Sequence, residues 1–286
     1  MITENYIVIT PAKNESNYIS FTINSMVRQS IKPNKWIIVD DGSVDETVEI
    51  VERAAQKYNW ISIIKKETNE RRAPGSNVVN AFNYGLNTIH VDYNFIVKLD
   101  SDLEFEADYF EKLLKEFEQN NKLGIAGGYC VNNTGDKQKI DNTPEYHVRG
   151  ATKMYRKKCF QEIEGLVPKF GWDGIDEMKA MMLGWETKSF KNIIVNHLRP
   201  TGQETGLLRY AWRRGVLNYY LGYNPLYLIL SSINNFSKKP YGLFGLTLFA
   251  GYIYSYLTKS EQMSDKKLID FIKKFQKKRI NSLQYK

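Results

Sequence analysis

The chain has 286 residues, of which 42% are hydrophobic and 25% are charged, and this composition predicts a globular protein of one large or two small domains. Its only cysteines, Cys130 and Cys159, have neither metal-ligand nor redox spacing, which argues against a disulfide and favours a reducing compartment. The first residues show no basic segment followed by a long apolar one, so we expect a protein without a secretory signal that acts in the cytosol.

The net charge of +8 can attract nucleic acid, anionic lipid or a phosphorylated substrate. Residues 259–286 hold nine Lys and Arg against three Asp and Glu, so most of the excess lies in one terminal segment. These cations surround an aliphatic stripe and not exposed aromatic rings, which argues against nucleic-acid binding.

The first hundred residues alternate between short β-rich runs and segments of helical periodicity. The runs lie at residues 6–10, 36–39, 61–64 and 94–97, and the third helix is predicted over 75–88. This alternation predicts a mostly parallel, Rossmann-like α/β sheet flanked by crossover helices. Ligands bind beyond the carboxyl ends of such strands, so the polar segments that follow the first, second and fourth runs should converge.

After Asp108 the pattern is more varied. It predicts a helix, a strand at 124–129, a polar loop at 132–144, a strand at 149–155, a helix at 159–163, and a helical segment that follows residues 172–177 and ends at Leu183. The alternation ends near Arg199-Pro200, and a Tyr- and Leu-rich helical region follows, so we place a domain boundary there.

Two C-terminal segments bear on a membrane. Residues 241–257 carry no charge but are short for a bilayer span, which favours a re-entrant or interfacial segment. Residues 266–279 combine an apolar stripe with Lys and Arg, which suits either anionic lipid or a helix packed on its own domain. The neighbouring uncharged segment favours lipid.

Asp100 and Asp102 follow the predicted strand at 94–97, and their spacing puts both carboxylates on one face. Hard cations such as Mg²⁺ or Mn²⁺ prefer several oxygen ligands, although an isolated Asp-x-Asp also occurs in surface turns. His197 follows an apolar run and either completes this metal shell or is a structural histidine at a strand end.

Asp40 and Asp41 directly follow a strand, where carboxylates can accept hydrogen bonds from a nucleobase or ribose. The alternative is a strand-end turn with Asp45 as a helix cap, and helix capping also explains Asn14 and Glu15. Arg71 and Arg72 precede a turn that opens a helix near Asn77, where a diphosphate can bind; a solvated surface pair explains them equally.

Asp173 and Asp176 precede a helical segment, and their spacing is that of a capping box. A carboxylate at such a place can alternatively act as a general base that takes the proton from a sugar hydroxyl.

Taken in chain order, these segments resemble the family 2 glycosyltransferases, which are inverting GT-A enzymes that use nucleotide-diphospho-sugars. The resemblance covers most of residues 5–200. Thr10–Glu15 resembles the family's opening Pro-x-x-Asn-Glu segment, Val39–Asp45 its nucleotide-binding segment, and Leu99–Asp102 its metal-binding Asp-x-Asp.

In that family an acidic catalytic motif is followed by a helix and a Gly-aromatic pair. Asp173 lies eleven residues before Gly184 and so matches the catalytic aspartate. The family's Glu-Asp pair is replaced by Trp172-Asp173, and Asp176 belongs to a shifted acidic pair, so Asp176 remains an alternative base. His197-x-Arg199 resembles the later element that contacts metal and phosphate.

The resemblance implies inverting transfer of a sugar from a nucleotide-diphospho-sugar to a hydroxyl of a glycan or lipid-linked acceptor. Asp102, with Asp100 and His197, would hold Mn²⁺ or Mg²⁺, and Asp173 would deprotonate the acceptor. The residues that would contact the nucleotide-sugar are Pro11, Ala12, Glu15, Asp40, Asp41, Arg72, Asn77, Asp100 and Ser101.

The implied GT-A catalytic domain spans residues 1–202, with a nucleotide-sugar half to about residue 102 and an acceptor half over 103–202. Residues 203–286 resemble helical extensions of membrane-associated bacterial members that build surface polysaccharides. We therefore expect a peripheral protein on the inner face of the cell membrane, with its C-terminal helices on anionic lipid.

Other classes fit less well. A sugar nucleotidyltransferase needs a Gly-rich phosphate loop after the first strand, and a dehydrogenase needs Gly-x-Gly-x-x-Gly there; residues 11–15 offer neither. A non-catalytic basic protein that binds membrane or nucleic acid is the remaining alternative.

Overall fold

The computed structural model describes residues 5–67, 75–134, 137–140, 143–199, 206–234 and 242–283. The chain divides into two compact units, Met1–Pro200 and Thr201–Lys286. The first unit contains, in chain order, β1 (Tyr6–Ala12), α1 (Ile19–Val27), β2 (Lys35–Asp40), α2 (Thr47–Lys57), β3 (Ile61–Lys65), α3 (Ser76–Leu86), β4 (Phe95–Leu99), β5 (Leu103–Phe105), α4 (Tyr109–Gln119), β6 (Leu123–Thr134), β7 (Lys137–Ile140), β8 (Thr152–Arg156), α5 (Lys157–Glu162), α6 (Trp172–Met182) and β9 (Glu186–His197).

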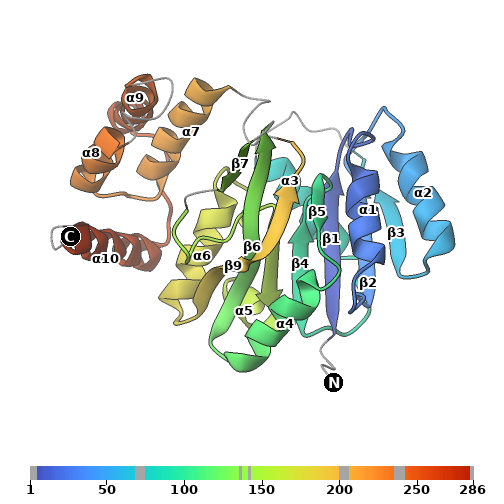
Figure 1. The fold of residues 1–286 in the computed structure, drawn as a ribbon. Coiled ribbons are helices and arrows are strands. Elements are labelled where there is room, and N and C mark those ends of the chain that lie inside the picture. The colour runs from blue at the N-terminus through green and yellow to red at the C-terminus, as the bar shows by residue number, and fades with distance from the viewer. Residues whose placement is uncertain are drawn as a thin grey trace. The chain divides into compact units, whose positions relative to one another are not determined.

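The strands of the first unit form one sheet in the order β3-β2-β1-β4-β8-β6-β9-β5, with β7 paired to β6 (Figure 1). The four N-terminal strands are parallel to one another, whereas β8 runs antiparallel to both β4 and β6. The predicted α/β class and the parallel arrangement of β1 to β4 are confirmed.

Helices cover both faces of this sheet, because the central strands are apolar on both sides. Tyr6 and Val8 of β1 belong to a core shared with α1, α2 and α4. The alternate residues Ile7 and Ile9 belong to a second core, shared with α3, α5 and α6. Successive side chains of a strand point to opposite faces, so a run of apolar residues fills both cores at once.

Two short strands differ from the sequence expectation. The predicted polar loop at 132–144 is wrong in part, because the end of β6 pairs with β7 through Asn132↔Lys139 and Thr134↔Lys137. A polar hairpin has no apolar period to reveal it, and its pairing depends on backbone hydrogen bonds. The three residues of β5 are likewise too few for a periodic signal.

The second unit is helical. It contains α7 (Leu207–Tyr220), α8 (Pro225–Asn234), α9 (Leu243–Leu257) and α10 (Lys266–Leu283). α7 and α9 approach closely because glycines lie at their crossing: a Cβ on Gly215 would lie 2.0 Å from the Leu248 carbonyl oxygen, and one on Gly251 would lie 2.4 Å from that of Trp212.

The apolar stripe of α10 packs within this unit. Leu268 and Ile272 are 0% and 1% exposed, and Gln276 Oε1 accepts a hydrogen bond from the Asn224 N–H (3.0 Å) after α7. Packing on its own domain, one of the two interpretations that the sequence left open, therefore describes this face of the helix, and its lysines are exposed. None of the helices in the described parts of the chain is long and apolar enough to cross a bilayer.

Candidate active site

The carboxyl ends of β1, β2 and β4 lie side by side at one edge of the sheet. Ala12 pairs with Asp40 where β1 and β2 end, and Ile9 of β1 pairs with Lys98 of β4. The polar segments after these three strands therefore meet, as the parallel arrangement requires. Pro11 lies near the end of β1, and buried Ser101 follows β4.

The turns after β1 and β2 are joined by hydrogen bonds. Asn14 donates its backbone N–H to Ser43 Oγ (2.9 Å), and its side-chain oxygen accepts from the Val44 N–H (2.9 Å). The Glu15 N–H donates to Thr47 Oγ1 (2.7 Å). No side chain caps α1, so the capping explanation for Asn14 and Glu15 is wrong and their side chains are used elsewhere.

Asp40 and Asp41 take part in the turn that follows β2. Oδ1 of Asp40 accepts from the Ser43 N–H (3.0 Å). The backbone carbonyl of Asp41 accepts a hydrogen bond from Lys13 Nζ (2.7 Å), and the Asp41 carboxylate lies 3.4 Å from Lys66 Nζ. The turn interpretation is confirmed for Asp40, and a contact with a nucleoside remains a prediction for both residues.

A cluster of metal-ligating groups lies beside these turns. Asp100, Asp102 and His197 each offer a ligand atom, and these atoms lie within 4.8 Å of one another. Asp100 follows β4, Asp102 precedes β5, and His197 ends β9 opposite Leu103. Two carboxylates and an imidazole form a donor set suited to Mn²⁺ or Mg²⁺, so the residues fit the predicted cation.

Positive groups surround Asp102. Its Oδ2 lies 3.2 Å from His197 Nε2 and accepts from Arg199 Nε (3.1 Å). Burial raises the pKa of Asp102, but the hydrogen bond and charge of His197 and the charge of Arg199 outweigh it, so the net pKa lies below the ordinary value. The pKa of His197 is raised in turn, because Asp102 outweighs the opposing effect of burial.

Arg199 also connects this cluster to Glu15. Its Nη2 donates to Glu15 Oε1 (2.7 Å) and lies 3.1 Å from Asp102 Oδ2. Oε2 of Glu15 is buried and has no hydrogen-bond partner among the described residues. Burial raises the pKa of Glu15 to about 7, with Arg199 opposing the rise. A buried carboxylate oxygen without a partner is costly, and a ligand beside it would supply one.

Asp173 and Asp100 are connected through Lys98 and Gly150. Lys98 Nζ donates to the carboxylate of Asp100 and to the Gly150 carbonyl (2.8 Å). Gly150 packs directly on Asp173: a Cβ at this glycine would lie 3.2 Å from Asp173 Oδ2. The half-buried Asp173 carboxylate is thus a near neighbour of the Asp-x-Asp segment.

Asp176 lies in the protein interior. It is 1% exposed, and Lys153 Nζ (2.8 and 3.0 Å) and Tyr155 OH (2.6 Å) donate to its carboxylate. Burial raises its pKa to about 7, and Lys153 opposes that rise. No side chain caps α6, whose N-cap is Gly171, so the capping-box interpretation of Asp173 and Asp176 is wrong.

The predicted phosphate-contacting turn is described only in part. Arg71 and Arg72 lie outside the described residues. Asn77 lies in the first turn of α3, where Ser76 Oγ donates to the Pro168 carbonyl (2.7 Å) shortly before α6 begins. The start of α3 therefore lies beside the segment that leads to Asp173.

Sequence reasoning missed the roles of two buried lysines of this region, Lys98 and Lys153, which are 2% and 0% exposed. It named Arg199 through the family resemblance, but not the contacts by which Arg199 joins Glu15 to Asp102. A lysine within an apolar strand was the available signal for Lys98, since lysine is rarely buried without a partner. Nothing local marks Lys153 or the partners of Arg199.

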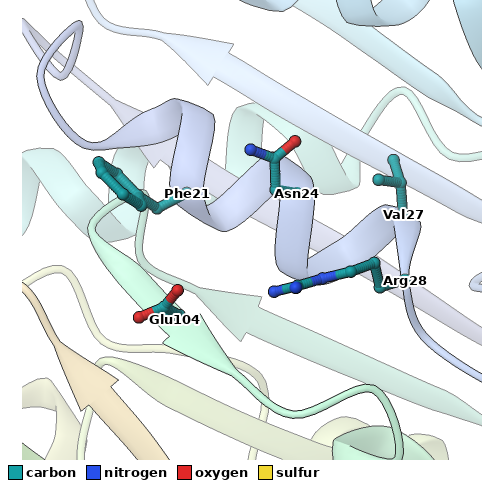
Figure 2. A pocket seen from close by; sticks show the side chains of 5 residues that line it. All are labelled: Phe21, Asn24, Val27, Arg28 and Glu104. Atoms are coloured by element: carbon teal, nitrogen blue, oxygen red, sulfur yellow. The ribbon is translucent and has the colours of Figure 1, made fainter.

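A hollow of the surface lies away from these residues. A depression of about 260 Å³ runs between α1 and β5, lined by Phe21, Asn24, Val27, Arg28 and Glu104 (Figure 2). None of the metal-ligating residues lines it. Because chemistry depends on the groups present and not on concavity alone, we place the site at the acidic cluster.

Comparisons with known proteins bear on the family and the fold of this chain. The sequence model of the family described as Glycosyl transferase family 2 matches residues 7–172. Glycosyltransferase GlyA of Streptococcus pneumoniae is 24% identical over 209 residues, which cover 64% of this chain and 29% of that protein. Minor teichoic acid biosynthesis protein GgaA of Bacillus subtilis is 32% identical over 145 residues, which cover 46% of this chain and 31% of that protein.

Solved structures show the same fold. Residues 1–349 of TarS from S. aureus align with a TM-score of 0.55 at 17% identity, covering 90% of this chain and 72% of that one. The mannosyltransferase PcManGT from Pyrobaculum calidifontis, solved with GDP-Man and Mn²⁺, aligns with a TM-score of 0.60 at 16% identity, covering 92% and 78%.

The chain spans less than a third of the length of GlyA and of GgaA. The family match nevertheless covers more than half of this chain, and the fold is the expected GT-A arrangement. The predicted resemblance is confirmed: the chain belongs to glycosyl transferase family 2.

Proposed function

We propose that this chain moves a sugar from a nucleotide-diphospho-sugar to an acceptor hydroxyl, with inversion at the anomeric carbon. The observation that carries the proposal is the close arrangement of the Asp100, Asp102 and His197 cluster and the Asp173 carboxylate on either side of Gly150. A site for the leaving group and a base for the nucleophile are the two parts that such a displacement needs.

The nucleoside would bind at the ends of β1 and β2. Asp40 and Asp41 would accept hydrogen bonds from its base or ribose, beside the backbone of Pro11 and Ala12. Support comes from the rigid strand ends and from relatives in fold that were solved with UDP and with GDP-Man. Arg72, Asn77 and Ser101 would complete the donor contacts, with the helix N-terminus at Asn77 favouring phosphate.

Asp100, Asp102 and His197 would hold Mn²⁺ or Mg²⁺. Such an ion, when bound, neutralises the negative charge that develops on the diphosphate leaving group. Arg199 holds the Asp102 carboxylate in place, and Glu15 Oε2 offers a further oxygen beside the cluster. The donor set and this unpartnered oxygen support a cation here.

Asp173 would take the proton of the acceptor hydroxyl as its oxygen attacks the anomeric carbon. The bond from that carbon to the diphosphate oxygen breaks as the new glycosidic bond forms, and attack on the opposite face inverts the centre. Asp176 is the weaker candidate, because its buried carboxylate already accepts from Lys153 and Tyr155.

We assign catalysis to residues 1–202, with donor binding mainly before and acceptor binding mainly after residue 102. Residues 203–286 would attach the chain to the inner face of the cell membrane, close to a lipid-linked or glycan acceptor. Because Leu268 and Ile272 of α10 are buried within this unit, the apolar part of this attachment would come mainly from other helices.

Exposed apolar side chains gather on α8 and α9, which pack against each other. They are Leu226, Ile229 and Leu230 on α8 and Leu243, Leu246, Phe249 and Leu257 on α9. No charged residue occurs in α9, and the exposed lysines of α10 belong to the same unit. An apolar face with nearby cations suits the surface of an anionic bilayer.

Affinity for Mn²⁺ should rise over the pH range in which His197 titrates, which lies above that of an ordinary histidine, because His197 must lose the proton that Asp102 stabilises before its nitrogen can ligate. Titration of the purified protein with Mn²⁺ across this range measures the effect. His197→Gln should weaken binding about tenfold or more and flatten the pH dependence. Affinity independent of both pH and His197 would contradict the ligand assignment.

Asp173→Asn should lower kcat for transfer by about 10²- to 10⁴-fold, because the amide cannot accept the acceptor proton. Donor binding, followed by calorimetry with Mn²⁺ and nucleotide-sugars, should stay within about twofold, whereas Asp102→Ala should lose it. Asp92→Asn removes an equivalent but exposed carboxylate and should leave kcat unchanged. Transfer at the parental rate in Asp173→Asn would show that the base is another residue.

The chain should sediment with vesicles of anionic lipid, more strongly at low salt, and less with neutral vesicles. Leu246→Glu should reduce sedimentation with both kinds of vesicle, and Lys273→Glu/Lys277→Glu should reduce it about tenfold or more with anionic vesicles alone. Reversal of two exposed lysines of the first unit, Lys115 and Lys122, provides the matched control. Equal sedimentation with neutral and anionic vesicles at low salt would refute the electrostatic part.

A further inference from the structure

Two buried lysines flank the ring of Trp172, the residue before the proposed base. Lys98 Nζ lies 5.4 Å and Lys153 Nζ 5.6 Å from the ring centroid, distances at which an aromatic face attracts a cation. Lys98 pairs with Asp100, in the proposed metal cluster, but Lys153 contacts none of the metal-ligating residues in the described contacts. Lys153 therefore needs a separate explanation.

All the donors of the Lys153 ammonium are used by the first turns of α6. It donates to the carbonyl of Asp173 and to Asp176 Oδ1 (2.8 Å), and it lies 2.9 Å from Glu177 Oε1. An ammonium group has three N–H donors, one for each of these three residues. A single side chain of β8 thus holds the backbone of the proposed base and both acidic residues behind it.

The same cluster also fixes the segment that packs on the other side of Asp173. Glu177 Oε1 accepts from the Val148 N–H (2.7 Å), and Glu177 Oε2 lies 2.9 Å from His147 Nδ1. Two residues later, Gly150 packs on the Asp173 side chain. The backbone and the side-chain environment of Asp173 are therefore tied to one buried ionic cluster, made of Lys153, Asp176, Glu177 and His147.

We propose that Lys153 is a positioning residue for the general base: by holding the Asp173 carbonyl and the Asp176–Glu177 pair, it sets the place of the Asp173 carboxylate relative to the donor site. The proposal rests on the proposed function, since it assumes that Asp173 is the base. Lys153 does not reach substrate itself, because its side chain is fully buried.

This role explains why the cluster is ionic. Burial lowers the pKa of Lys153, but the charges of Asp176 and Glu177 outweigh it, so the ammonium is retained. A buried ion cluster contributes little net stability compared with apolar packing, yet it is costly to break and holds its members in a defined geometry. A displacement of about 1 Å of a reacting group costs about 100-fold in rate.

The test uses Lys153→Met/Asp176→Asn, because Lys153→Met alone would leave two buried carboxylates without their ammonium and endanger folding. The pair removes one charge of each sign and leaves Glu177 opposite His147. We expect kcat to fall about 10- to 100-fold, while the donor KM and Mn²⁺ affinity stay within about twofold. The core variant Val51→Ala, which lies in α2, controls for loss of stability and should keep kcat.

The decisive comparison repeats the pair in the Asp173→Asn background. If Lys153 acts through Asp173, the pair should change the residual kcat by less than about twofold there. An undiminished 10- to 100-fold loss in that background, an unchanged kcat in the folded pair, or a rise in donor KM equal to the loss in kcat would each overturn the proposal. Parental activity of Asp173→Asn itself would instead overturn the proposed function.

Discussion

Carboxylates from distant parts of the chain lie at one edge of the sheet, and the cations that offset their repulsion are the condition on which this site depends. Glu15 and Asp102 share Arg199, and Asp100 pairs with Lys98. The charges of Asp102 and Asp100 add to the burial that raises the pKa of Glu15. A divalent cation bound at this edge would further reduce the repulsion among these carboxylates, because it adds positive charge beside them.

Buried cations also connect the proposed base to the carboxylates of this edge. Lys98 links the Asp-x-Asp segment to Gly150, and Lys153 links α6 to β8 behind Asp173. The residues that stabilise the leaving group and the residue that removes the proton would then be held in place relative to one another by buried ion pairs and not by flexible surface loops. This arrangement suits a displacement in which donor and acceptor must be aligned to within a fraction of an ångström.

The sequence predicted those parts of the molecule that depend on local patterns. Strands β1 to β4 are apolar runs between turns, and their parallel order brought Asp40 and Asp102 to one edge. The contact of Arg199 with Glu15 joins residues 184 positions apart, for which no local pattern exists. The polar strand β7 and the packing of the α10 stripe depend on tertiary pairing, so periodicity could not decide either of them. The same limit hid the partners of Lys153.

The most direct test of the account is the place of a bound cation. Anomalous scattering from crystals grown with Mn²⁺ and a nucleoside diphosphate should show a peak bonded to the Asp102 carboxylate and His197 Nε2, with Asp100 beside it and the Asp173 carboxylate facing the sugar end of the donor. A Mn²⁺ peak at another group of residues, with the nucleotide away from the ends of β1 and β2, would contradict it.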